Sequence, residues 1–228
     1  MKNKLFLLNS FLLIAACGNT NNNATKFEIS TAKNTTDREA LLAVKFCVIS
    51  NDFKEFCRNS NITPRDLDNL SLYFDAMVTR SQTREILEEK FPGNWPLYLK
   101  RLLKNGGFSF ATFSLDKENI LAFKRAEKNS KKVNYYEINN PEIPLRFVKK
   151  GEYWFIDFCD ILGTDDKKLA DRIYASQIRY LKILKFENQF IKSNINKFES
   201  FDDFCKATIP EFIEFETNVQ NPKAKAGL

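Results

Sequence analysis

The spacing of apolar residues changes once in the first two thirds of this chain, and that change constrains the fold more than any other feature. Before Asn105-Gly106-Gly107, apolar residues recur every three or four positions, as on one side of a helix. After Gly107 they alternate, as in strands with one buried face, through "FSFATFSL", "NILAFKRA" and "KVNYYEI". Helices followed by such strands predict an α+β fold, with N-terminal helices packed on a curved antiparallel sheet.

Capping signals predict where the first helices begin. Thr36 and Glu39 form a capping box, and Asn51 marks a break. Thr63 followed by a proline predicts a second start, and Ser81 predicts a third. "WPLYLKRLLKNGG" predicts one more short helix, which ends at the glycines.

The last third of the chain begins with a hairpin signal and then returns to helical spacing. Lys150-Gly151, between "LRFV" and "YWFIDF", predicts a tight hairpin that closes the sheet. A long amphipathic stretch follows, with an expected interruption at 193–196 and a last helix in "SFDDFCKATIPEFIEFE". We therefore expect an α+β domain over 37–160, a C-terminal helical extension over 161–220 and a disordered tail over 221–228.

The long stretch has a basic outer side. We interpret it as the solvated face of a packed helix, because Asp171 and Glu187 alternate with the basic residues. Contact with anionic lipid head groups or with an acidic partner is the alternative reading. The basic residues are Lys168, Arg172, Arg179, Lys182, Lys185 and Lys192.

The N-terminus has the features of an export signal. Lys2 and Lys4 precede an apolar run over 5–16, which is shorter than the ~20 residues that a membrane-spanning helix needs. The run ends in Ile14-Ala15-Ala16-Cys17, which resembles the lipobox of bacterial lipoproteins. The resemblance implies a signal peptide over 1–16, cleavage before Cys17, and diacylglycerol attached to Cys17. A plain signal peptide and a buried N-terminal helix remain the alternatives.

Polar residues dominate from Cys17 to residue 36, so we expect a disordered tether between the lipid anchor and the domain. The expected location is the cell envelope, with the protein held on the membrane by its lipid. Residue 18 is Gly and not Asp, which by resemblance to enterobacterial lipoproteins favours the outer membrane where the organism has one.

Composition excludes several classes of function. The chain has no histidine, which removes Ser-His-Asp and Cys-His catalysis and histidine-containing zinc sites. Its 35 basic and 29 acidic residues are interspersed, without the concentrated basic patch of a nucleic-acid-binding protein. No phosphate loop or dinucleotide fingerprint is present. We expect no nucleic acid, metal or cofactor.

Four cysteines follow the lipobox, each directly after a phenylalanine. An even number in an exported protein favours disulfides, with three pairings open, and buried thiols are the alternative. These cysteines are Cys47, Cys57, Cys159 and Cys205.

The layout resembles the nuclear transport factor-like cone fold. The resemblance lies in "VISNDFKEF" at the end of the first helix and in the closing hairpin "RFVKKGEYWFIDF". It implies a pocket between the concave sheet face and the helices. The residues expected to line or back this pocket are Tyr135, Tyr136, Arg146, Trp154 and Asp157.

Three functions fit these observations. The first is a non-catalytic, lipid-anchored binding module for a small apolar or amphipathic ligand, or for an envelope protein partner. The second is an enzyme with carboxylate and tyrosine chemistry, in which Asp157 acts as a general base. The third is a structural or surface-interaction lipoprotein without a cavity. Because no catalytic motif is recognisable, we expect a binding protein and not an enzyme.

Overall fold

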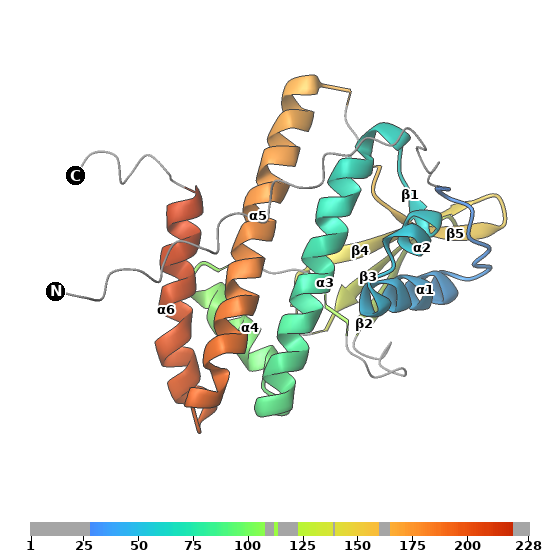
Figure 1. Ribbon diagram of the computed structural model, residues 1–228. Helices are drawn as coiled ribbons and strands as arrows, with labels where there is room; N and C mark the ends of the chain where they lie inside the picture. The colour runs from blue at the N-terminus through green and yellow to red at the C-terminus, as the bar shows by residue number, and fades with distance from the viewer. Residues whose placement is uncertain (1–27, 108–111, 114–122, 139, 160–164, 221–228) are drawn as a thin grey trace.

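The computed structural model describes residues 28–107, 112–113, 123–138, 140–159 and 165–220. These residues form helices and one five-stranded sheet, which confirms the predicted α+β class (Figure 1). The α-helices are α1 (Asp37–Ser50), α2 (Phe53–Arg58), α3 (Leu67–Lys90), α4 (Trp95–Lys104), α5 (Lys167–Asn194) and α6 (Phe201–Gln220). The strands are β1 (Ser60–Asn61), β2 (Phe123–Asn129), β3 (Lys132–Glu137), β4 (Asn140–Lys150) and β5 (Tyr153–Asp157).

The start and end of α1 agree with the sequence signals. Thr36 and Glu39 form both hydrogen bonds of the capping box. Asn51 adopts a left-handed conformation with φ of 55°, which ends the helix. Asp52 then caps α2, because its side chain accepts a hydrogen bond from the Glu55 backbone N–H at 2.9 Å.

The helix start expected at Ser81 is wrong. Helix α3 runs without a break through this position, from Leu67 to Lys90. Ser81 is buried, and its hydroxyl accepts a hydrogen bond from the Phe113 backbone N–H at 2.9 Å. The residue that resembles a local cap therefore bonds to a segment 32 residues further along the chain.

The sheet has the order β1-β5-β4-β3-β2. The meander from β2 to β5 is antiparallel as expected, and the hairpin at Lys150-Gly151 is confirmed by pairing of Lys150 with Tyr153. Gly151 has φ of 60° in this turn. One correction concerns β1, which pairs parallel with β5 and makes the sheet mixed. Most of the strand expected at 108–115 and part of that at 119–126 lie outside the described residues, and the described residues 112–113 are not in a strand.

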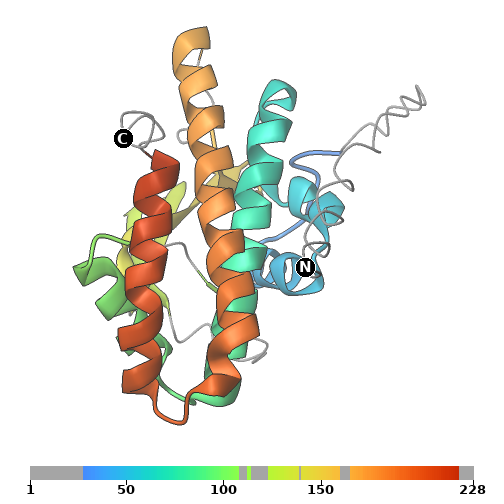
Figure 2. The ribbon, with the colours of Figure 1, turned by 60° about the vertical axis from the view of Figure 1, so that its left-hand side comes forward.

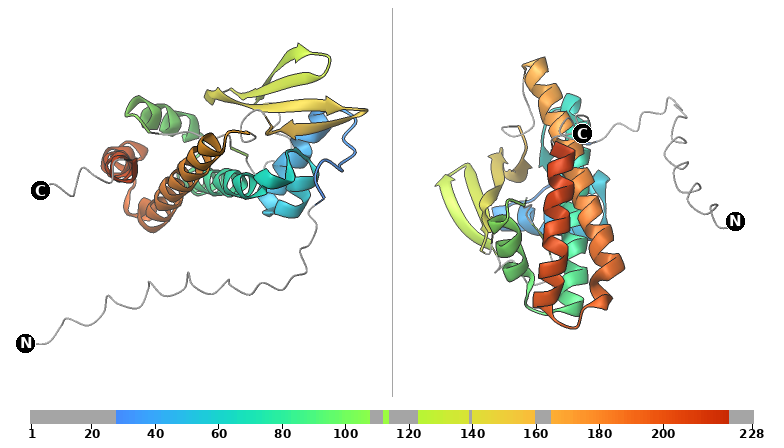
Figure 3. Two further views of the ribbon diagram at one scale, coloured as in Figure 1. Left: turned by 90° about the horizontal axis from the view of Figure 1, so that it is seen from above. Right: turned by 90° about the vertical axis from the view of Figure 1, so that its left-hand side faces the viewer.

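Helices cover one face of the sheet, and the other face is turned away from them (Figure 3). Helices α1, α2 and the first half of α3 pack on the covered face, in a core that includes Val44, Phe56, Phe74 and Phe147. We call the covered side the inner face and the opposite side the outer face. The expectation of N-terminal helices packed on a sheet is therefore met.

A second core lies among the helices alone. The end of α3, helix α4, the second half of α5 and helix α6 bury Leu87, Trp95, Ile191 and Phe204. Figure 2 shows α3, α5 and α6 side by side. Helix α5 ends at Asn194 and a short 3₁₀ turn over Ile195–Lys197 follows, which confirms the predicted interruption. The C-terminal helices thus pack along α3 and share its cores.

Within the described ranges, no helix combines the length and the apolar composition needed to cross a bilayer.

Candidate functional site

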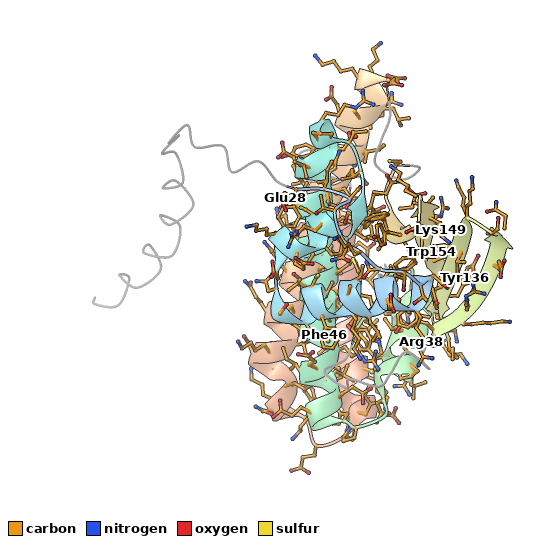
Figure 4. All side chains as sticks on the ribbon, turned by 90° about the vertical axis from the view of Figure 1, so that its right-hand side faces the viewer. Glu28, Arg38, Phe46, Tyr136, Lys149 and Trp154 are labelled. Carbon is orange, nitrogen blue, oxygen red and sulfur yellow. The ribbon has the colours of Figure 1, made fainter. Side chains whose placement is uncertain are left out.

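The sheet divides the five expected pocket residues between its two faces. Successive side chains of a strand point to opposite faces, so Tyr135 and Tyr136 point in opposite directions. Tyr135 and Trp154 belong to the buried core on the inner face. Trp154, from the inner face, and Tyr136, from the outer face, are both labelled in Figure 4. Tyr136, Arg146 and Asp157 are on the outer face. The structure therefore brings three of the five residues together.

Side chains fill the space between the inner face and the helices. Phe56, Phe147 and Phe158 are each at most 1% exposed there, and Tyr73 contacts the ring of Phe158 at 5.0 Å between centroids. Tyr135 is 4% exposed and packs edge-on against Phe147. Tyr135 and Trp154 are thus core residues and do not line an open cone pocket, which corrects that expectation.

The outer face holds a shallow recess of about 350 Å³ that contains the other three residues. We call it the outer-face recess. Asn134 donates a hydrogen bond from Nδ2 to the Tyr136 hydroxyl oxygen at 3.1 Å, which leaves the hydroxyl proton able to donate elsewhere. The recess is lined by Lys128, Lys132, Asn134, Tyr136, Pro144, Arg146, Phe147 and Asp157.

Asp157 is held by neighbouring groups within the protein. Its Oδ1 accepts a hydrogen bond from Asn61 Nδ2 at 2.6 Å and a longer one from the Cys159 backbone N–H at 3.4 Å. Asn61 is its register partner in the parallel pair of β1 and β5. A carboxylate that is 5% exposed and fixed by an amide suits a structural role better than proton transfer to a substrate.

A second recess, of about 400 Å³, lies on the outer surface of the helical layer. We call it the α5 groove, because six of its residues belong to α5 and it is bordered by one residue from α3 and one from α6. Phe215 of α6 stacks on Phe186, with ring centroids 3.8 Å apart and an interplanar angle of 8°. The groove is lined by Leu72, Ile178, Leu181, Lys182, Lys185, Phe186, Gln189 and Phe215.

Sequence reasoning did not identify the α5 groove. Ile178 is 45% exposed, and Lys182, Lys185 and Gln189 follow it at helical spacing. An isoleucine on the basic side of an amphipathic helix is the signal that could have pointed to this surface. Leu72 and Phe215 could not have been assigned to it, because only tertiary packing brings them beside α5.

A buried polar cluster joins the two cores. Arg80 Nη1 lies 2.6 Å from Glu187 Oε1, and the Tyr98 hydroxyl donates to the same oxygen. Burial, together with the charge of Glu187, holds the pKa of Tyr98 well above its usual value. Neither described recess opens onto these three residues. The cluster therefore connects α3, α4 and α5 as part of the framework.

The four cysteines after the lipobox are thiols, and the structure contains no disulfide between them. This differs from the favoured expectation of disulfides. It agrees with the alternative of buried thiols at three positions, whereas Cys159 is half-buried. Cys47 and Cys57 lie in the core beside the sheet, whereas Cys205 lies in the helical core. The described residues contain no group of three Cys, Asp or Glu side chains that could hold a metal ion.

Comparisons with known proteins assign neither a family nor a function to this chain. No protein-family model matches the chain, and neither a curated protein nor a solved structure matches it. The resemblances to bacterial lipoproteins and to the nuclear transport factor-like fold remain predictions from the sequence.

Proposed function

We propose that this chain is a lipid-anchored protein of the bacterial cell envelope that acts by binding, and that the α5 groove takes an amphipathic molecule with an anionic group. The observation that carries the proposal is the pairing of an apolar floor with two lysines in one surface recess. Binding sites for small molecules typically combine such apolar walls with a few polar groups that fix orientation.

The apolar part of the groove suits an alkyl chain. Leu72, Leu181, Phe186 and Phe215 come from three helices and present contiguous aliphatic and aromatic surface. Each CH₂ group moved from water into such surroundings contributes about 0.8 kcal/mol. About ten buried methylene groups would therefore contribute about 8 kcal/mol, which is the free energy of a micromolar dissociation constant.

The charged part of the groove favours an acidic head group. Lys182 and Lys185 are one turn apart on α5 and both contribute to the groove. No acidic side chain is among the described residues that line it. The electrostatic potential at the groove is thus positive, and a carboxylate or phosphate on the ligand is the complementary group.

Membrane attachment is the second part of the proposal and is supported by residues 1–17 of the sequence. Cys17 follows a basic start, an apolar run and small residues in the order of a lipobox. Lipid on Cys17 would keep the domain at a membrane surface, and Gly18 favours the outer membrane. Replacement of Cys17 by Ser should move the protein from the membrane fraction to the soluble fraction. Retention of the C17S variant in the membrane would contradict the anchor.

The binding proposal is tested on the chain from Asn19 onward, which keeps every described residue. Native mass spectrometry first shows whether a small molecule is retained and lost on denaturation. Calorimetric titrations with dodecanoate and with dodecan-1-ol then compare an acidic and a neutral ligand of equal chain length. We expect dodecanoate to bind about tenfold more tightly because of the two lysines.

A matched pair of variants separates the groove from general charge. Lys182→Gln with Lys185→Gln should remove the preference for dodecanoate, whereas Lys206→Gln, at an exposed position of α6, should keep it. Equal affinity of the two ligands in the unmodified protein would refute the anionic head group. Absence of binding by both would refute the groove as a site for amphiphiles.

An envelope protein partner is the second candidate, because α5 exposes apolar residues within the groove and one turn before it. Tyr174 and Ile178 are 41% and 45% exposed. An amphipathic helix of a partner could place apolar side chains on them, as in helix-in-groove recognition. Crosslinking from residue 174 to a specific protein in intact envelopes, without retained small molecules, would favour this candidate.

A further inference from the structure

The outer-face recess has the composition of a binding surface, separate from the α5 groove. The recess lies on the outer face of the sheet, and the groove lies on the helical layer. Figure 3 shows that this sheet face is turned away from the helices. Its residues come from strands β2 to β5, including Lys128 from β2 and Arg146 from β4. Side chains that project from adjacent, hydrogen-bonded strands are held by a rigid framework.

The recess has a surplus of positive charge. Lys128, Lys132 and Arg146 contribute to it, and their charges are opposed by the single carboxylate of Asp157. That carboxylate is already engaged by Asn61. The three cationic residues are on three neighbouring strands, which are about 4.8 Å apart from one to the next. A ligand that carries more than one negative charge fits such a spread better than a single small ion.

Neutral hydrogen-bonding groups lie among the charges. The Tyr136 hydroxyl accepts from Asn134 and can donate outward, and the Asn134 side chain offers a second amide proton and a carbonyl oxygen. Arg146 is exposed, and a guanidinium pairs well with carboxylate or phosphate through two parallel hydrogen bonds. Cations mixed with neutral donors and acceptors match a ligand that carries both hydroxyl and acidic groups.

The aromatic content argues against single-stranded nucleic acid. Proteins that bind it present several aromatic rings on which successive bases stack. The recess contains Tyr136 and Phe147, and Phe147 is only 1% exposed. One accessible ring cannot stack a run of bases, whereas it can lie against one ring of a sugar chain.

We infer that the outer-face recess binds an acidic carbohydrate chain, with Lys128 and Arg146 at its acidic groups and Asn134 and Tyr136 at its hydroxyl groups. The site does not depend on the α5 groove or on the lipid anchor. Acidic groups of the same chemistry also occur as free phosphate, so the experiment must separate a sugar chain from a simple ion.

The test uses the full chain in a neutral detergent and a fluorescently labelled hexamer of galacturonic acid as the probe. Fluorescence anisotropy measures its affinity, with maltohexaose, inorganic phosphate and a hexathymidine oligonucleotide as competitors. We expect the acidic hexamer to bind, the affinity to fall as salt rises, and maltohexaose to compete at least about tenfold more weakly than unlabelled hexamer.

Two variants with the same loss of charge locate the site. Arg146→Gln should weaken binding about tenfold, because it removes one charge-assisted pair. Lys104→Gln, at the end of α4 and outside the recess, should change it by less than about twofold. Both positions are exposed, so circular dichroism and melting temperature should match the parent chain.

Several results would overturn the inference. Equal weakening by Arg146→Gln and Lys104→Gln would show general electrostatic attraction. Competition by inorganic phosphate at the same concentration as the hexamer would show a simple ion site. Competition by hexathymidine at that concentration would show a nucleic-acid surface, and no binding of the hexamer would exclude the acidic carbohydrate.

Discussion

Arg80 and Glu187 form an ion pair in the interior of the protein, with 2.6 Å between Nη1 and Oε1 and side chains that are 1% and 3% exposed. Arg80 is on α3 and Glu187 is on α5, so the pair joins the helix that spans both cores to the C-terminal helices. The Arg80 guanidinium also lies 5.9 Å from the centre of the Trp95 ring on α4. The buried charge pair thus contacts three helices, α3, α4 and α5.

Removal of one partner of this pair should be costly. Arg80→Met leaves the Glu187 carboxylate buried without its cation, and such a change destabilises a protein by about 3–5 kcal/mol. Urea denaturation followed by circular dichroism measures the loss.

An exposed pair of the same length provides the control for Arg80→Met. Arg101 and Asp202 are also 2.6 Å apart, but their side chains are 32% and 64% exposed. Arg101→Met should cost less than about 1 kcal/mol, because solvent screens exposed pairs. Replacement of both Arg80 and Glu187 by Met should recover much of the loss. Equal effects of the two single Arg→Met variants would contradict the importance of burial.

The environment of Glu216 predicts that a neutral residue at this position stabilises the protein by an amount that depends on pH. Burial, and then the charge of Glu187, raises the pKa of Glu216 above its usual value, and Arg80 opposes this shift only in part. A raised carboxyl pKa in the folded state means that this group favours folding at low pH. That contribution is lost as the pH rises from the unfolded pKa, near 4.5, through the folded one.

Glu216→Gln should therefore raise the melting temperature at pH 7, where the raised pKa of the buried Glu216 carboxyl disfavours the folded state. The difference should vanish at pH 4, where Glu216 is protonated and resembles glutamine. Glu214→Gln, on the same helix, is the control for loss of one negative charge. Thermal melts from pH 4 to pH 7.5 measure both variants, and a gain that is the same at every pH would contradict burial as the cause.

Local signals in the sequence predicted the parts of the fold that local contacts determine. The capping box at Thr36, the left-handed Asn51 and the turn at Gly151 each depend on residues within a few positions. The helix start predicted at Ser81 was wrong because the Ser81 hydroxyl accepts a hydrogen bond from the Phe113 backbone N–H, and no local sequence pattern indicates this distant contact. Strand β1 was missed because two polar residues, Ser60 and Asn61, carry no alternation and pair only through tertiary contact with β5.

The candidate sites could be predicted only in part for the same reason. Alternation along β3 separates Tyr135 from Tyr136, but it does not say which face the helices cover. Tyr136, Arg146 and Asp157 were therefore grouped correctly with one another and wrongly with Tyr135 and Trp154. The α5 groove forms only because α3 and α6 pack beside α5. Local sequence patterns do not predict which helices pack against one another.

The cysteines should differ sharply in reactivity. Cys47, Cys57 and Cys205 are at most 3% exposed, whereas Cys159 is half-buried. Burial raises the pKa of Cys47 to about 12 and that of Cys57 to about 11, so little reactive thiolate forms at neutral pH. N-ethylmaleimide at pH 7.5 should modify Cys159 at least about tenfold faster than these three.

Peptide mapping after timed quenching measures the four rates, and Cys159→Ser is the control that should remove the fast phase. The denatured mass without reductant should equal that of the reduced chain. A deficit of about 4 Da, which corresponds to two disulfides, would contradict the thiol state of the structure.

Asp37 connects the start of α1 to the sheet. Its effect on stability should depend on pH in the opposite sense from that of Glu216. Its Oδ2 accepts hydrogen bonds from Arg125 Nε at 2.7 Å and from the Tyr135 hydroxyl at 2.8 Å. Burial alone would raise the pKa of Asp37, but these two hydrogen bonds and the charge of Arg125 hold it below the usual value. The same arrangement, led by burial, raises the pKa of Tyr135 to about 12.

A carboxyl group whose pKa is lowered in the folded state contributes stability above its unfolded pKa, near 3.8, and that stability is lost as the pH falls through the folded value. Asp37→Asn should therefore destabilise the protein by roughly 1 kcal/mol at pH 7, and the difference should shrink toward pH 2. Tyr135→Phe removes one of the two hydrogen bonds and should show a smaller loss at pH 7. Urea titrations at pH 7, 4 and 2.5 measure the series. A loss of stability in Asp37→Asn that stays constant down to pH 2.5 would show that the effect comes from the shape of the side chain at this position and not from its charge.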